Sequence, residues 1–230
     1  MFFKRWFWRT FLLCFAAIFA YQFWIFSQVV YWNYYNPSSS AFMQSRLEAL
    51  RHRDVDAVLR ARWVPYERIS PNLKRAIIAA EDAKFLAHEG FDFQALQNAY
   101  QKNLKKGRLV AGGSTISQQL AKNLFLSAEK TPWRKFQEVI ITLMLENVMS
   151  KRRILEIYLN VIEWGNTVFG AEAAARHYFG VSASSVTAEQ AARLAAMVPN
   201  PRFYDEHRNT SWLSKKTRII LGRMASASIP

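Results

Sequence analysis

Residues 112–123 read Gly-Gly-Ser-Thr-Ile-Ser-Gln-Gln-Leu-Ala-Lys-Asn, a glycine-led segment rich in hydroxyl and amide side chains. Two carboxylates, Glu81 and Glu138, lie in dense, motif-like runs on either side of it. Carboxylates can take and direct protons. A Gly-Gly turn at a helix start, together with Lys122, can hold a phosphate. The combination therefore indicates chemistry on a sugar phosphate.

Working outward, apolar residues recur at helical spacing, and neither an alternating strand pattern nor an internal repeat is found. Ser70-Pro71, Thr131-Pro132 and Ser150 are typical helix starts, and Thr187 with Gln190 is a capping box. The expected helices cover residues 42–62, 71–81, 91–106, 114–124, 132–149, 151–160, 188–198 and 214–225. We therefore expect an all-α domain.

The two acids lie on apolar helices. Glu81 follows Ile77 by four residues and so continues an apolar stripe, which is costly unless the carboxylate faces a cleft. Glu138 lies on a helix that is apolar nearly all round, which predicts a buried helix. A partly desolvated carboxylate is a better base, so Glu81 is the stronger candidate for proton transfer.

The N-terminal part of the chain contains an apolar run from Phe11 to Tyr31, inside a stretch without formal charge. A helix of this length would span about 30 Å of hydrocarbon. A cleaved signal peptide is the alternative, but the run is too long and no small-residue cleavage site follows it. We therefore expect one transmembrane helix over residues 11–31.

Charge orients this helix. Lys4, Arg5 and Arg9 precede the span and no cation follows it closely, so residues 1–10 are expected in the cytoplasm. Residues 32–64 are expected to form a linker and a connector helix, and residues 65–230 the catalytic domain outside the inner membrane. The span is expected to contribute nothing to the core of that domain. The one cysteine of the chain, Cys14, lies in the span, so no disulfide is expected in the outer domain.

The net charge is +14, and without the three N-terminal cations it is +11. Such a balance fits either a solvated basic surface or an anionic partner. Nucleic acid is not expected outside a membrane, so anionic lipid and lipid-linked pyrophosphate remain.

Several local patterns have simpler readings. Asp82 is expected to brace the site or a helix end, and His88 to be structural, because no zinc-ligand spacing is present. Residues 107–114 nearly match a Walker A loop, but Gly113 stands where the lysine must be. Residues 127–130 match a Ser-x-x-Lys tetrad, but the other penicillin-binding elements are missing.

The ordered motifs resemble those of the peptidoglycan glycosyltransferases of family 51. The matching runs are 81–90, 112–126, 134–138, 151–160, 170–174, 178–180 and 189–201. The chain ends shortly after them, so it is more similar to the monofunctional biosynthetic members than to bifunctional penicillin-binding proteins. One departure is Lys130, where relatives often carry arginine, which grips phosphate with two N–H groups.

The resemblance implies a lysozyme-like fold and polymerisation of lipid II into β-1,4 glycan with release of undecaprenyl diphosphate. It implies that Glu81 deprotonates the acceptor 4-hydroxyl and that attack inverts the anomeric carbon. The residues implied at the diphosphate are Glu138, Lys122, Lys130, Arg134 and Lys135. Those implied to line the donor groove are Ser114, Thr115, Gln118 and Gln119.

The resemblance also leaves a divalent cation, Mg²⁺ or Mn²⁺, open at the diphosphate, although no dedicated ligand cluster is found. Expected partners are lipid II, the growing lipid-linked glycan, membrane lipid and other proteins of wall synthesis and division. Two alternative functions remain: a lysozyme-like hydrolase, and a membrane-anchored scaffold of the wall-building machinery. A hydrolase would need neither the anchor nor a basic diphosphate site.

Overall fold

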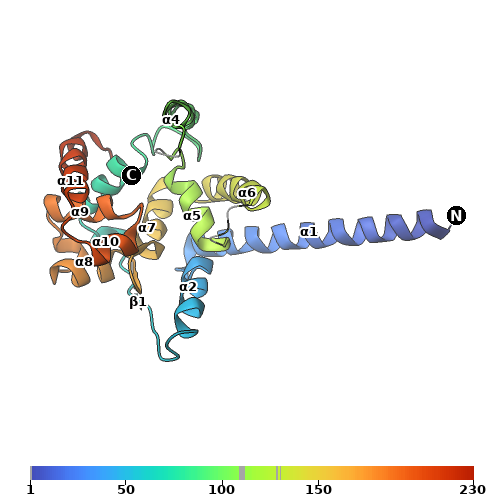
Figure 1. Cartoon of the computed structure of the whole chain (residues 1–230). Coiled ribbons are helices and arrows are strands. Elements are labelled where there is room, and N and C mark those ends of the chain that lie inside the picture. The colour runs from blue at the N-terminus through green and yellow to red at the C-terminus, as the bar shows by residue number, and fades with distance from the viewer. Residues whose placement is uncertain (1, 109–111, 128, 130) are drawn as a thin grey trace.

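The computed structural model describes residues 2–108, 112–127, 129 and 131–230. One long helix, α1 (Phe2–Tyr34), leads away from a domain built mainly of shorter helices (Figure 1). This arrangement confirms the all-α architecture with one N-terminal apolar helix. Residues 5–34 are long and apolar enough to cross a membrane, as a single-pass anchor would. Lys130 lies outside the described residues.

The other elements follow in chain order. The remaining helices are α2 (Ala41–Arg51), α3 (Pro71–Glu81), α4 (Phe93–Lys106), α5 (Ile116–Phe125), α6 (Pro132–Val148), α7 (Lys151–Val161), α8 (Ala171–Phe179), α9 (Ala188–Met197), α10 (Pro201–Glu206) and α11 (Ser211–Arg223). The short strands are β1 (Arg60–Ala61), β2 (Glu163–Gly165) and β3 (Val168–Phe169). Single 3-10 turns lie at Tyr66–Arg68, Ala183–Ser185 and Met224–Ser226.

The predicted helix starts are confirmed by their caps. The Ser70 hydroxyl accepts a hydrogen bond from the Asn72 N–H, and Thr131 caps α6 in the same way through the Arg134 N–H. Thr187 and Gln190 form the expected reciprocal capping box. These side chains satisfy N–H groups that a helix leaves without partners in its first turn.

The prediction for residues 42–62 is wrong beyond Arg51, where α2 ends. The chain turns there because the Asp56 N–H bonds to the side chain of Asp54, a local alternative to the helical hydrogen bond. Farther on, β1 lies parallel to β3, and β3 pairs antiparallel with β2. Strands of two or three residues are too short to show a recognisable alternation.

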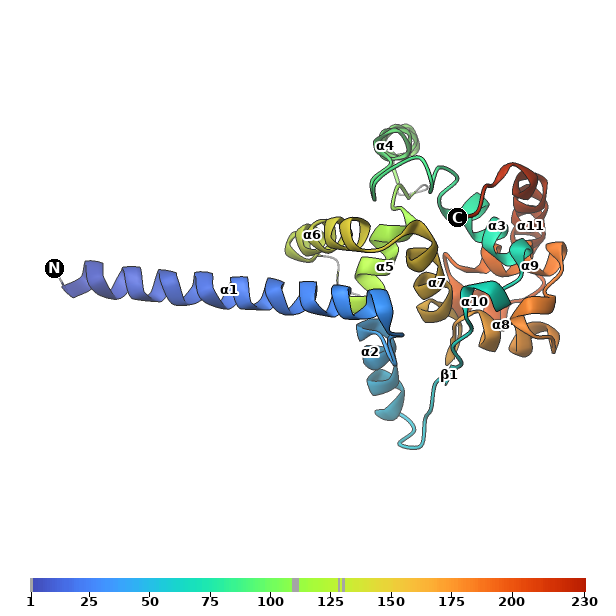
Figure 2. The same cartoon turned by 180° about the vertical axis from the view of Figure 1, so that it is seen from behind.

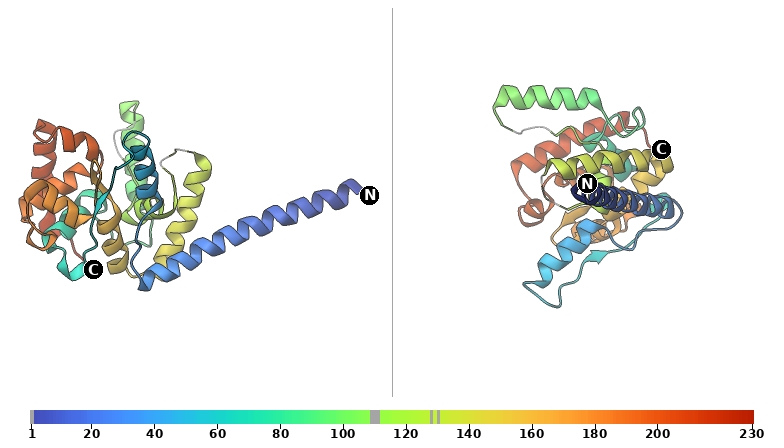
Figure 3. Two further views of the ribbon diagram at one scale, coloured as in Figure 1. Left: turned by 90° about the horizontal axis from the view of Figure 1, so that it is seen from below. Right: turned by 90° about the vertical axis from the view of Figure 1, so that its right-hand side faces the viewer.

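The core lies between α3, α9 and α11 and continues between α5, α6 and α7. Helix α9 packs on both α3 and α11, and all three gather at the end of the domain farthest from the N-terminus (Figure 2). Helix α7 buries Ile154, Leu155, Ile157, Tyr158 and Leu159, so it is enclosed on most of its surface. By contrast, α4 stands apart at one edge of the domain (Figures 1 and 3).

The expectation that the apolar span contributes nothing to the core of the domain is wrong. Ile25 and Val29 are fully buried against the domain, and α1 packs on α6. Trp32 contacts the Phe125 ring, with the ring centres 5.1 Å apart. The Arg153 guanidinium donates to the Trp32 and Tyr35 carbonyls at 2.8 and 2.7 Å. A helix end leaves such carbonyls free to accept these bonds.

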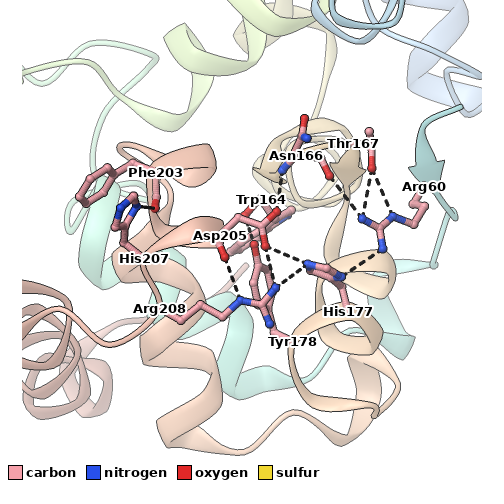
Figure 4. A network of polar contacts seen from close by, with 10 residues as sticks. All are labelled: Arg60, Trp164, Asn166, Thr167, His177, Tyr178, Phe203, Asp205, His207 and Arg208. Carbon is pink, nitrogen blue, oxygen red and sulfur yellow. Dashed lines mark hydrogen bonds and ion pairs between the residues drawn. The ribbon is translucent and has the colours of Figure 1, made fainter. Parts of the chain in front are cut away.

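A polar network ties the strands to α8 and α10 (Figure 4). The Asp205 carboxylate accepts the Asn166 N–H at 2.9 Å and is paired with His177 and with Arg208, also at 2.9 Å. Gly165 is required beside it, because an added Cβ would lie 2.7 Å from Asp205 Oδ2. The network therefore fixes the β2–β3 turn against the two helices.

Candidate active site

Glu81 is the last residue of α3, and its side chain is partly buried. The Gln119 Nε2 of α5 donates to Glu81 Oε2 at 2.9 Å. Burial raises the pKa of the Glu81 carboxyl, although the Gln119 hydrogen bond and the charges of Lys216 and Lys122 lower it in part. A carboxylate that is costly to ionise and has one hydrogen bond is suited to accept a proton.

The orientation of the Gln119 amide is set by Tyr158, a buried residue of α7. Its hydroxyl donates to Gln119 Oε1 at 2.9 Å, so the Gln119 amide nitrogen is left facing Glu81. Burial, followed by the charges of Glu81 and Asp82, raises the pKa of Tyr158 well above its usual value. The phenol therefore stays protonated and keeps donating. Sequence reasoning placed Tyr158 inside a motif but assigned it no part in the site.

Asp82 and His88 brace the site, as expected. Asp82 Oδ1 pairs with His88 Nε2 at 2.9 Å, and Asp82 Oδ2 accepts the Ile116 N–H at the start of α5 at 3.0 Å. The carboxylate therefore joins the end of α3 to the positive end of α5. This contact fixes Glu81 relative to Gln119.

The polar start of α5 divides into two groups of side chains. Thr115 and Gln118 form a capping box, and the Thr115 hydroxyl also donates to the Gly90 carbonyl at 2.7 Å. Thr115 is thereby buried and fully engaged, whereas Ser114 is exposed. Ser114 and Gln118 line the cavity described below, and Thr115 lines a neighbouring one.

Helix α6 contributes an acid held between two cations. Glu138 is buried, and its two carboxylate oxygens pair with Arg134, at 2.6 Å, and with Lys135. The Arg134 Nε is buried and has no hydrogen-bond partner among the described residues. Because both oxygens of Glu138 are engaged, this carboxylate organises cations instead of standing free as an acid.

Lys122 extends from the last turn of α5 toward the same place. It has no ion-pair partner within the described parts of the chain. Burial lowers the pKa of Lys122, the charge of Glu138 raises it, and the charges of Arg134 and Lys135 lower it further. An anion placed among these three cations would be stabilised.

A cavity of about 390 Å³ brings these groups together. It is lined by Phe42, Glu81, Ser114, Gln118, Gln119, Lys122, Arg134, Lys135, Glu138, Val198 and Pro199. Most of the sequence-predicted site residues that the structure describes therefore share one space, with Thr115 beside it. Phe42 was missed because a single aromatic residue on a connector helix carries no functional signal.

Two neighbouring cavities border this one. An apolar cavity of about 440 Å³ shares Ser114, Gln118 and Lys135 with it and is walled by Phe91, Phe93, Leu96 and Val139. A third, of about 280 Å³, shares Glu81 and Ser114 and is lined by the start of α4. Glu81 therefore lies where two polar cavities meet, and the cationic cavity also borders apolar space.

A protein-held metal does not fit this site. Among residues 2–108, 112–127, 129 and 131–230, no group of three or more His, Cys, Asp or Glu side chains could hold a metal ion. Both oxygens of the buried carboxylate in the cavity, Glu138, already have cationic partners.

The helical fold, the apolar anchor and a cavity that holds a raised-pKa carboxyl opposite a set of cations are typical of a membrane-anchored enzyme of glycosyl transfer. A family model described as transglycosylase matches residues 49–225. The chain belongs to the transglycosylase family.

Curated relatives agree with this assignment. A biosynthetic peptidoglycan transglycosylase of Nitrosospira multiformis is 82% identical over 230 residues, which is all of both chains. One of Methylobacillus flagellatus is 63% identical over 227 residues, covering 99% of each chain. One of Nitrosomonas europaea is 59% identical over 227 residues, covering 99% of this chain and 93% of its own.

Proposed function

We propose that this chain is a peptidoglycan glycosyltransferase that polymerises lipid II into β-1,4 glycan strands. The observation that carries the proposal is the shared cavity, in which one carboxyl with a raised pKa faces a separate group of cations organised by Glu138. A sugar diphosphate needs both, because one group must accept a proton while another stabilises the departing anion.

In the proposed step, Glu81 takes the proton of the acceptor 4-hydroxyl. The acceptor oxygen forms a bond to the anomeric carbon of the lipid-linked donor as the bond from that carbon to the diphosphate breaks. The electron pair leaves with the diphosphate, and the anomeric configuration inverts. Lys122, Arg134 and Lys135 stabilise the charge of the leaving group, and Glu138 holds the last two in place.

The lipid chain of the donor has a place beside the diphosphate. The apolar cavity shares Lys135 with the cationic one, so a single ligand can reach both. Phe93 and Leu96, which wall this cavity, continue along α4 at helical spacing into the exposed Tyr100 and Leu104. We infer that this exposed stripe contacts the membrane, from which a lipid-linked substrate enters.

The same function sets the topology. We propose that the N-terminus lies in the cytoplasm and the domain outside the inner membrane, and the cations that precede the span support this orientation. Partners among other wall-synthesis and division proteins follow from the same location. A divalent cation at the diphosphate would be held mainly by phosphate oxygens, since the described residues offer no ligand cluster.

The decisive experiment offers the purified full chain two substrates separately: labelled lipid II and finished peptidoglycan. We expect lipid II to become long glycan with release of undecaprenyl diphosphate, and finished peptidoglycan to remain intact. Mass spectrometry of the digested product should show β-1,4 repeats. Solubilised wall together with unreacted lipid II would show that the chain is a hydrolase.

A further inference from the structure

Gln22 is a polar residue within the apolar anchor, and its side chain contacts the domain. Its Nε2 donates to the Oε1 of Gln137, on α6, at 2.7 Å. Gln22 shares one face of α1 with the buried Ile25 and Val29. The hydrogen bond therefore lies inside the interface between anchor and domain.

Gln137 is buried and immediately precedes Glu138. Both lie in the N-terminal half of α6, within two turns of its first residue, Pro132. A helix moves as a rigid unit over such a distance. A shift or rotation at Gln137 therefore displaces Glu138 together with Arg134 and Lys135.

Helix α6 packs on both α5 and α1. Helix α5 carries Lys122, so the α5 contact sets the distance between the two sources of positive charge. The α1 contact supports α6 independently, and the Arg153 bonds to the Trp32 and Tyr35 carbonyls fix the end of α1. The anchor is therefore tied to the domain at two separated places, to α6 through Gln22 and to α7 through Arg153.

The pair is also incompletely satisfied. Gln22 Oε1 is buried and has no partner among the described residues. A side-chain amide with an unmet acceptor in an apolar setting is costly, so stability alone does not account for the Gln22–Gln137 pair.

We propose that the membrane anchor is part of the catalytic apparatus. Gln22 is a positioning residue for the α6 side chains that bind the diphosphate of the substrate. The inference rests on the proposed function. Gln22 touches no substrate; it acts through Gln137, which sets the place of Glu138 and its two cations.

The test compares near-isosteric variants of the full chain, reconstituted in bilayer discs with lipid II. Gln22→Met and Gln137→Met should each lower kcat about three- to tenfold, the range expected for losing one neutral hydrogen bond inside a packed interface, with little change in KM. The double variant should be less impaired than the sum of the two, because neither amide is then left alone.

Gln28→Met is the matched control. Gln28 is half-buried on the same helix and makes no side-chain hydrogen bond to the described part of the domain. It should keep wild-type kcat. An equal loss at Gln28, or a Gln22→Met variant with lowered Tm and unchanged kcat, would overturn the positioning role.

A second measurement separates this inference from the proposed function. In a Cys14→Ser background, Gln22→Cys and Gln137→Cys should be joined by a short bismaleimide, detected by mass spectrometry without any substrate. Failure to join them would disprove the docking. If they join and the wild-type chain still leaves lipid II monomeric, the proposed function fails while the docking stands.

Discussion

Two carboxyls of this molecule, Glu81 and Asp205, show opposite responses to partial burial. Asp205 has His177, Arg208 and the Asn166 N–H around it, and although burial alone would raise the pKa of Asp205, these hydrogen bonds lower it overall. Glu81 has one hydrogen bond from Gln119, and burial raises its pKa.

The difference separates a structural acid, Asp205, from the acid proposed for proton transfer, Glu81. Asp205 joins the β2–β3 turn, α8 and α10, and its carboxylate oxygens are taken up by these contacts (Figure 4). Glu81 keeps a lone pair toward an open cavity, at some cost to the fold. Variants of the two residues should therefore fail in different ways.

The largest effect is expected from Glu81→Gln, which keeps the shape and removes the base. Lipid II polymerisation should fall by about two orders of magnitude or more. Thermal stability at neutral pH should not fall, because an acid whose folded pKa is raised stabilises only at low pH and loses that contribution as pH rises through the folded pKa. Polymerisation at near wild-type rate would show that another group is the base.

Next come the residues at the cations. Lys122→Ala and Glu138→Gln should each reduce turnover about a hundredfold. The first variant removes a cation that stabilises the leaving diphosphate, and the second loosens Arg134 and Lys135. Steady-state kinetics with lipid II measure this directly. Unaltered kinetics in both variants would remove the diphosphate site from the cavity.

Asp205→Asn should reverse the pattern. It should cost about 1–3 kcal/mol of unfolding free energy, as expected when hydrogen bonds to a charged acceptor are lost, and leave kcat near that of the wild type. Because the pKa of Asp205 is lowered, its contribution is present above the unfolded pKa and is lost as pH falls through the folded one. Denaturation experiments at neutral and at acid pH should therefore show that the difference in unfolding free energy between the wild type and Asp205→Asn shrinks at low pH.

The smallest effect concerns the acid limb of the pH–rate profile. Glu81 must be ionised to act, so activity should rise with pH around a midpoint above the usual range of a glutamate. Lys216→Gln removes a cation that lowers the pKa of Glu81, and should move that limb slightly to higher pH. Lys215→Gln, beside it and exposed, is the control and should leave the limb in place. A limb unmoved by Lys216→Gln would mean that another group controls it.

Much of this could be predicted from the sequence because it is local. Ser70, Thr131 and Thr187 carry their helix starts with them, and Glu81 in an apolar stripe already indicates a desolvated acid. The docking of Ile25 and Val29 could not be predicted, since an apolar residue faces lipid or protein equally well. The prediction that α6 is buried all round is wrong for the same reason. Trp133 and Phe136 are exposed, although the apolar pattern of the helix indicated burial in protein.

The docked anchor also decides how far the cavity stands from a bilayer. From Arg5 to Gln22 the helix rises about 25 Å, close to the thickness of the hydrocarbon layer. With that part in a membrane, Gln22 lies near the outer boundary and the domain cannot drift away on a loose tether. The exposed Trp133 and Phe136 then rest at the water–lipid boundary. An enzyme anchored in this way would meet a lipid-linked substrate by lateral diffusion in two dimensions, at a height fixed by the helix and without a search through bulk water.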